Sequence, residues 1–193
     1  MATYKSIAYD QALANPSAMV LLQTETASAS GDVSFTSDID DTYKEYFFRF
    51  IDIHPSADGA NFSFQASTDG GSSYGVTITT LYFRALNNEG DSDAGLSYSV
   101  GDDLAQSTAY QELMNTGNDN DQSGAGWLRL FNPSSTTFVK HFISTTSNVT
   151  LDNYERNIYA SGYFNTTSAL DAIQFKMDSG NIDAGTIKMY GIN

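Results

Sequence analysis

Hydrophobic and polar residues alternate over short runs of this chain, and turn-forming residues separate the runs. An alternation with a period of two is typical of a β-strand, because successive side chains point to opposite faces of the sheet. Glycine, asparagine, aspartate and serine gather between the runs, where they favour tight turns. The pattern predicts about nine or ten strands, drawn from residues 45–53, 61–67, 76–84, 97–100, 107–115, 127–131, 136–145, 156–164, 170–178 and 185–192.

The run EYFFRFIDI, over residues 45–53, has the strongest strand pattern. Its large apolar side chains are divided between the two faces, with Tyr46, Phe48 and Phe50 on one and Phe47, Ile51 and Ile53 on the other. Because both faces are apolar, we expect a central strand that is covered on both sides.

Two glycine-rich connections predict β-hairpins. The segment TDGGSSYG joins the second and third runs, and Gly180 and Gly185 bracket the connection between the last two. Strands joined by such short connections are usually antiparallel neighbours in one sheet. A third turn, NPSS, in which Pro133 presets the backbone, is expected between 127–131 and 136–145.

Strands at this spacing, without alternating helices, favour an all-β fold. We therefore predict an antiparallel, jelly-roll-like β-sandwich over residues 19–193, preceded by an N-terminal arm over residues 1–18. Residues 107–115 fit a strand edge and also, through Tyr110 and Met114, one face of a helix. In the last two runs the side chains expected to face the core are Ile173, Phe175, Met177, Ile187 and Met189.

Composition and net charge restrict the kinds of molecule that this protein is expected to bind. The chain has 193 residues, with 9 Lys+Arg against 23 Asp+Glu, and its formal net charge is -14. A surface this acidic repels phosphate backbones and anionic lipid, and we therefore expect neither nucleic acid nor a membrane as partner. The chain contains no cysteine, which excludes disulfides and thiolate metal sites. We expect no signal peptide, because the N-terminus lacks a basic segment that leads into an apolar run.

No catalytic motif is recognisable. Of the two histidines, His54 is expected to cap a turn, and His141 is expected to be a packed or hydrogen-bonded residue within a strand. No H-E-x-x-H pattern occurs. The acidic clusters at 37–41, 89–93 and 101–103 are expected in loops, where Asp side chains close turns. We therefore predict a protein that is not an enzyme, with a two-carboxylate hydrolase as a less favoured alternative.

One loop is a candidate cation site. The segment TGNDNDQSG, over residues 116–124, brings Asn118, Asp119 and Asp121 together between glycines. Calcium takes six to eight hard oxygen ligands, and alternating Asp and Asn side chains supply some of them. The segment lacks the spacing of an EF-hand. A plain Asn/Asp/Gly loop is the favoured interpretation, calcium is the alternative, and no other cofactor is expected.

Aromatic side chains close to loops are candidate glycan contacts. Trp127, Tyr110 and Tyr74 lie in or beside predicted turns. Flat aromatic faces on a β-sandwich can stack on sugar rings, while neighbouring Asp and Asn side chains form hydrogen bonds. The competing interpretation for Trp127 is that it begins a buried strand, since a lone tryptophan is more often part of a core.

Several segments together resemble virion-associated structural proteins of marine tailed phages, notably cyanophages. These segments are YFFRFIDIHPSADGANFSFQAS, GNDNDQS, LRLFNPSSTTFVKHF and ASGYFNTTSALDAIQFKMDSGNIDAGTIKMYGI. The similarity runs from about residue 45 onward and is most specific in FNPSSTTFVKHF and SGNIDAGTIKMYGI. The resemblance implies a jelly-roll-like sandwich carried on a phage particle, and it transfers no site residues.

The expected function is therefore that of a non-enzymatic structural component of a bacteriophage virion, either a capsid decoration or a tail-associated appendage. Such a protein would be made in the host cytoplasm and assemble with other virion proteins, as a homo-oligomer. The alternative is a receptor- or glycan-binding module of a phage tail or fibre, which would contact a glycan on the host surface.

Overall fold

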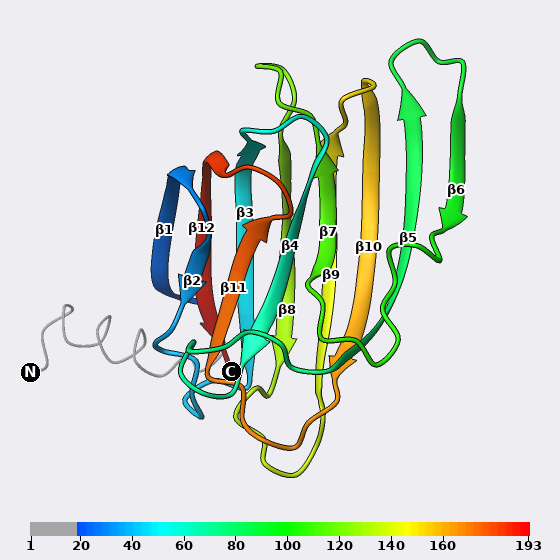
Figure 1. Ribbon diagram of the computed structural model, residues 1–193. Helices are drawn as coiled ribbons and strands as arrows, with labels where there is room; N and C mark the ends of the chain where they lie inside the picture. Colours follow the sequence, from blue (N-terminus) through cyan, green and yellow to red (C-terminus); the bar gives the residue numbers. More distant parts are fainter. Residues whose placement is uncertain (1–18) are drawn as a thin grey trace, which may run out of the picture.

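The computed structural model describes residues 19–193, and the arm predicted over residues 1–18 lies outside the described residues. The described part contains no helix and forms two antiparallel β-sheets packed face to face (Figure 1). This confirms the antiparallel β-sandwich, while the jelly-roll subtype stays a prediction. The strands are β1 (Val20–Ser30), β2 (Val33–Phe35), β3 (Glu45–Pro55), β4 (Ala60–Ser67), β5 (Ile78–Asn88), β6 (Ala94–Tyr98), β7 (Gln111–Thr116), β8 (Gly124–Phe131), β9 (Lys140–Val149), β10 (Tyr154–Phe164), β11 (Ala172–Met177) and β12 (Ile182–Ile192).

The two sheets differ in width. The larger has eight strands in the order β1-β12-β3-β8-β9-β10-β5-β6, and the smaller has four in the order β2-β11-β4-β7. Strand β7, at the edge of the smaller sheet, packs against β9 and β10. Strands β5 and β6 therefore extend past the smaller sheet, as Figure 1 shows at the right of the molecule.

Most connections carry the chain from one sheet to the other. Within the described residues, only β5–β6, β8–β9 and β9–β10 are consecutive neighbours in one sheet. The turn predicted at NPSS is confirmed: Ser135 donates its N–H to the Asn132 carbonyl at 3.1 Å, and the turn lies between the antiparallel neighbours β8 and β9. The two predicted hairpins are wrong, because β4 and β5 lie in different sheets and so do β11 and β12. A short glycine-rich segment can cross the roughly 10 Å between packed sheets as readily as it can turn within one.

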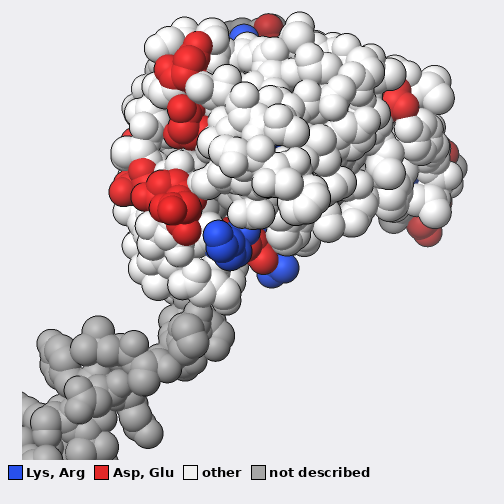
Figure 2. Space-filling view, turned by 90° about the horizontal axis from the view of Figure 1, so that it is seen from below, with Lys and Arg blue, Asp and Glu red and all other residues white. Residues whose placement is uncertain are grey.

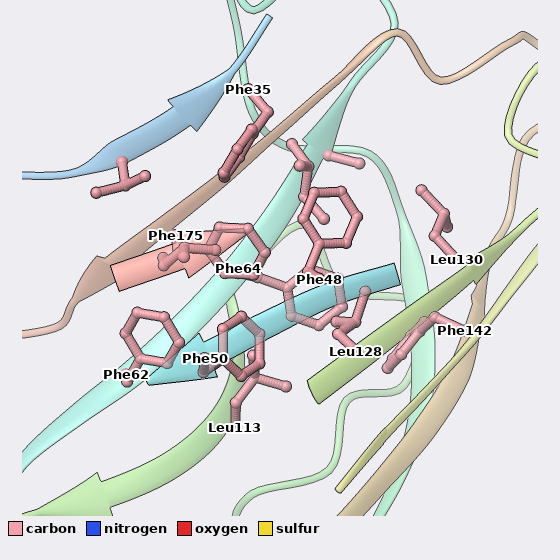
Figure 3. Close-up of a cluster of buried hydrophobic side chains, with 14 of the residues drawn as sticks. Phe35, Phe48, Phe50, Phe62, Phe64, Leu113, Leu128, Leu130, Phe142 and Phe175 are labelled. Atoms are coloured by element: carbon pink, nitrogen blue, oxygen red, sulfur yellow. The ribbon is translucent and has the colours of Figure 1, made fainter. Parts of the chain in front are cut away.

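Aromatic rings fill the space between the sheets (Figure 3). The ring of Phe175 lies 5.3 Å from that of Phe50, 5.5 Å from that of Phe48 and 5.7 Å from that of Phe62. Edge-to-face and offset arrangements of this kind add to the stabilisation that comes from burying apolar area. Phe175 therefore joins the smaller sheet to the larger one at the centre of the core.

The side chains predicted to face the core in the last two strands do so. Ile173, Phe175 and Met177 on β11 are buried, and so are Ile187 and Met189 on β12. Strand β12 lies between β1 and β3 and is hydrogen-bonded to both.

Strand β3 is paired on both sides, with β12 and β8, but the described part of the chain covers only one of its faces. Phe47 and Ile51 are half-buried on the outer face, which corrects the expectation that both faces are covered. Ile53 is also placed wrongly by simple alternation, since it is fully buried in the core. Asp52 has a φ of 51° and the pairing with β8 shifts between Phe50 and Ile53, which turns the Ile53 side chain inward.

The sequence pattern missed the first two strands and misplaced the start of another. Strand β1 is largely exposed and polar at the edge of its sheet, and β2 is only three residues long. Strand β9 begins at Lys140, because residues 136–139 belong to the preceding loop and Phe138 is exposed there. Residues 107–115 form the strand β7 from Gln111 onward, and not a helix.

Candidate binding surfaces

Charge is unevenly spread over the molecule. Figure 2 shows the lower end of the sandwich, where Asp and Glu side chains gather toward one side and most of the visible surface is uncharged. Binding surfaces that exclude water are depleted of charge at their centre. Two hollowed surfaces on opposite sheets meet the requirements for binding: an aromatic one on the larger sheet and a polar one on the smaller sheet.

The aromatic surface is on the outer face of the larger sheet, where β12, β3 and β8 lie side by side. Leu128 and Leu130 face the core, and the residues that alternate with them, Trp127 and Arg129, therefore face outward. The rings of Phe47 and Trp127 are stacked, with centroids 6.1 Å apart and planes 26° apart. Register on β3 and β12 places Tyr190 opposite Phe47. We call Phe47, Trp127, Arg129 and Tyr190 the Trp127 cluster.

A guanidinium group completes the Trp127 cluster. The Cζ atom of Arg129 lies 5.7 Å from the ring centroids of both Phe47 and Trp127. An ion pair from its Nε to Glu45 Oε1, at 3.2 Å, holds it there. A hollow of about 330 Å³ opens at this surface, lined by Met19, Phe47, Arg49, Gly126, Trp127 and Tyr190. The arrangement offers flat apolar faces with cationic hydrogen-bond donors beside them, which suits a sugar ring or an apolar side chain of a partner.

The polar surface is a groove on the smaller sheet and the loop that precedes β7. It has a volume of about 530 Å³. We call it the Glu112 groove, and its lining includes Asn61, Asp102, Tyr110, Glu112, Lys176 and Asp178.

Glu112 is the most perturbed acid that lines this groove. Burial raises its pKa to about 7, and the charges of Asp102 and Asp178 act in the same direction. The hydroxyl of Tyr82 donates a hydrogen bond to Glu112 Oε1 at 2.8 Å, and Arg84 is near; both lower the pKa again. Glu112 can therefore exchange a proton near neutral pH. Sequence reasoning missed this residue, whose only signal is a single acid within an otherwise uncharged strand.

Tyr110, one of the predicted glycan contacts, lines the same groove. Its hydroxyl donates a hydrogen bond to Gln174 Oε1, and burial raises its pKa to about 12. The Nζ atom of Lys176 lies 4.0 Å from the centroid of the Tyr110 ring and therefore occupies one face of that ring. Only the other face of Tyr110 is left for a ligand.

The three predicted aromatic contacts do not form one site. Tyr74 lines a separate hollow of about 590 Å³ with Ser73, Val76 and Thr108. It is close enough to Tyr110 to raise the pKa of that residue. Trp127 lies on the outer face of the other sheet. A single ligand of ordinary size therefore cannot contact Trp127 together with the two tyrosines.

The predicted calcium ligands lie in the exposed loop between β7 and β8. The side-chain amide of Asn118 donates to the Ser56 carbonyl at 3.3 Å. The carbonyl of Asp119 accepts a hydrogen bond from the Gln122 amide at 2.9 Å. Asp121 is exposed. Nowhere in residues 19–193 do three or more His, Cys, Asp or Glu side chains form a group that could hold a metal ion, and calcium binding by this loop stays a prediction.

The two histidines lie apart from the Glu112 groove. His54 Nδ1 is 3.8 Å from Asp183 Oδ2, and its Nε2 is 3.3 Å from the Asp119 carbonyl. His141 is exposed on β9 beside Tyr163, with ring centroids 6.0 Å apart. Neither is within reach of a serine and a carboxylate in the way a Ser-His-Asp triad would require, as far as the described hydrogen bonds show.

The fold defines the class: an antiparallel two-sheet β-sandwich. No protein-family model, curated protein or solved structure matches the chain. In the described part, no helix is long and apolar enough to cross a membrane.

Proposed function

We propose that this protein is a non-enzymatic structural component of a bacteriophage virion, a capsid decoration or a tail-associated appendage, and that it works through protein–protein assembly. The observation that carries the assembly role is the apolar outer face at the β5–β6 end of the larger sheet. There Leu81, Phe83, Leu96 and Tyr98 are all exposed. A contiguous exposed apolar surface on an otherwise acidic protein favours contact with another protein.

The virion assignment has its own support. The segments quoted above resemble virion proteins of marine tailed phages and carry no catalytic motif. A cysteine-free β-sandwich with a net charge of -14 suits long exposure to a salty medium, where ions screen its self-repulsion. The jelly-roll subtype belongs to the same proposal.

Purified particles of the phage that encodes the chain provide the test. We expect mass spectrometry to detect the protein in particles that have been freed of host debris, and cryo-electron microscopy to locate it. Hundreds of copies per particle would place it on the head, and a handful would place it on the tail. Its absence from purified particles would contradict the proposal.

A second candidate function is glycan binding, which the Trp127 cluster favours. Stacked aromatic rings beside two arginines, Arg49 and Arg129, can bind a sugar ring and its anionic substituents. We expect titration with host lipopolysaccharide to change the fluorescence of Trp127, the single tryptophan of the chain. Binding that survives Trp127→Ala unchanged would exclude this surface, and Tyr74→Ala, in the connection between β4 and β5, serves as the control away from it.

A further inference from the structure

The edge strand β6 presents unused hydrogen-bonding groups at one end of the larger sheet. Among residues 19–193 it is bonded only to β5, and every residue from Ala94 to Tyr98 is exposed. An exposed strand edge is a template for pairing with another strand, and proteins that avoid such pairing place charges or proline there. The strand β6 reads AGLSY and contains neither. The edge is therefore unprotected.

The hydrogen bonds to β5 show which backbone groups are free. Ser99 donates its N–H to the Tyr82 carbonyl and Asn88 donates to the Asp93 carbonyl, both at 3.0 Å. Hydrogen-bonded pairs alternate along an antiparallel ladder, which directs the backbone groups of Gly95 and Ser97 toward β5 as well. The N–H and C=O groups that point to the open edge are those of Ala94, Leu96 and Tyr98.

We propose that β6 pairs antiparallel with β6 of a second copy of this chain, about a two-fold axis at Leu96. This pairing places Leu96 opposite Leu96 of the second copy and Ala94 opposite its Tyr98. All free groups of the edge then find partners, because an antiparallel strand pair is its own two-fold complement. The two larger sheets become one continuous sheet.

The edge strand β6 is where a second copy can approach an acidic chain, because the strand itself carries no charge. The chain has a net charge of -14, and two copies repel each other over most of their surfaces. The strand β6 is an uncharged place where approach is possible, although Asp91 and Asp93 precede it and Asp102 and Asp103 follow it. Pairing brings these flanking acids of the two copies near each other, and salt should therefore strengthen the association.

The outer face gains apolar contacts from the same pairing. Phe83 lies opposite Tyr98 across β5 and β6, and its ring is stacked on Tyr159 with centroids 4.9 Å apart. Leu96 is 75% exposed in the single chain and lies opposite Ala85. In the pair, Leu96 would contact Leu96 of the second copy, and Tyr98 would lie beside Ala94 of that copy.

Light scattering after size exclusion tests the pairing over a range of concentration and salt. We expect a dimer that strengthens with salt, and a loss of the dimer in Leu96→Lys. Phe138→Lys is the matched control, because Phe138 is also exposed, at 70%, but lies in the β8–β9 loop. Circular dichroism melts of both variants check that the fold is retained. A wild-type monomer under all conditions, or a dimer that Leu96→Lys leaves intact, would overturn the proposal.

Thiol crosslinking gives a geometric check, since the natural chain has no cysteine. Across a hydrogen-bonded antiparallel pair the two Cα atoms are about 5.5 Å apart. A short bismaleimide should therefore join two Leu96→Cys chains rapidly and join Phe138→Cys chains only slowly. Equal rates would contradict the pairing.

The pairing specifies the self-assembly part of the proposed function, and the two can fail separately. A dimer joined at β6 that is missing from purified particles would leave the pairing intact and contradict the virion role. A protein that is monomeric in solution but present in purified particles would contradict the pairing and leave the virion role intact.

Discussion

At the scale of single residues, a few side chains decide both stability and chemistry. Phe175 contacts rings from both sheets, and Glu112 is the half-buried acid of the groove whose pKa is raised. Lys140 shows how far tertiary contacts can override side-chain type. It is fully buried, and its Nζ donates hydrogen bonds to the carbonyls of Thr166 and Ser168. These carbonyls replace the water that a lysine normally keeps.

Phe175→Ala should destabilise the fold strongly. It removes a fully buried ring that packs against both sheets, and the cavity left behind adds to the lost transfer free energy. We expect the free energy of unfolding to fall by about 3–5 kcal/mol in denaturant titrations. Phe138→Ala, in which the lost ring is exposed, should change it by less than about 0.5 kcal/mol. Similar losses in both variants would show that Phe175 is not at the centre of the core.

Glu112 should make stability fall as pH rises. Its pKa is raised from 4.5 to about 7 on folding, so the folded state binds the proton more tightly than the unfolded chain does. The contribution is fully present below pH 4.5 and is lost as pH rises through about 7. We expect Glu112→Gln, which keeps an oxygen for the Tyr82 hydroxyl, to remove this part of the pH dependence. Unfolding titrations of both proteins at pH 5 and pH 8 measure it, and parallel curves would contradict the assignment.

At the scale of elements, strand packing depends on close backbone approaches. A Cβ atom at Gly162 on β10 would lie 2.3 Å from the Thr79 carbonyl oxygen and 2.9 Å from the Thr80 Cα on β5. Both are backbone atoms and cannot rotate away. The glycine therefore lets β10 and β5 pair at their normal spacing.

Gly162→Ala should push β10 and β5 apart. We expect a loss of about 1–3 kcal/mol in the free energy of unfolding, as is typical when a packed site is overfilled. Ser161→Ala, on the same strand with a half-buried side chain, is the control and should be close to neutral. Equal stability of the two variants would mean that the β5–β10 pair tolerates the added methyl group.

At the scale of the whole molecule, the net charge of -14 sets the response to salt. Self-repulsion favours the expanded, unfolded chain, and added ions screen it. We expect the melting temperature to rise as sodium chloride is added at pH 7. Sucrose, which stabilises by exclusion without screening charge, separates this effect from a general solute effect. A melting temperature that is independent of salt would show that repulsion is not a significant cost.

The sequence by itself determined the all-β class and the inward faces of several strands. Alternation is a local property of the sequence. It correctly predicted that the side chains of Phe48 on β3 and Ile173 on β11 face the core. It failed at Ile53, because the bulge at Asp52 reverses the side-chain direction after it. It also failed for β1, whose mostly exposed residues have too few buried positions to form a pattern.

Only the tertiary structure decided which strands are neighbours and which residues share a surface. Turn composition is the same whether a segment turns within a sheet or crosses between sheets, and the connections β4–β5 and β11–β12 were misread for that reason. The tertiary structure placed Trp127 on the outer face of the larger sheet, and it placed Tyr74 and Tyr110 in the connections before β5 and β7. Strand order left β6 as an open edge. Strand neighbours far apart in sequence are set by how two apolar faces cover each other, and no local pattern encodes that choice.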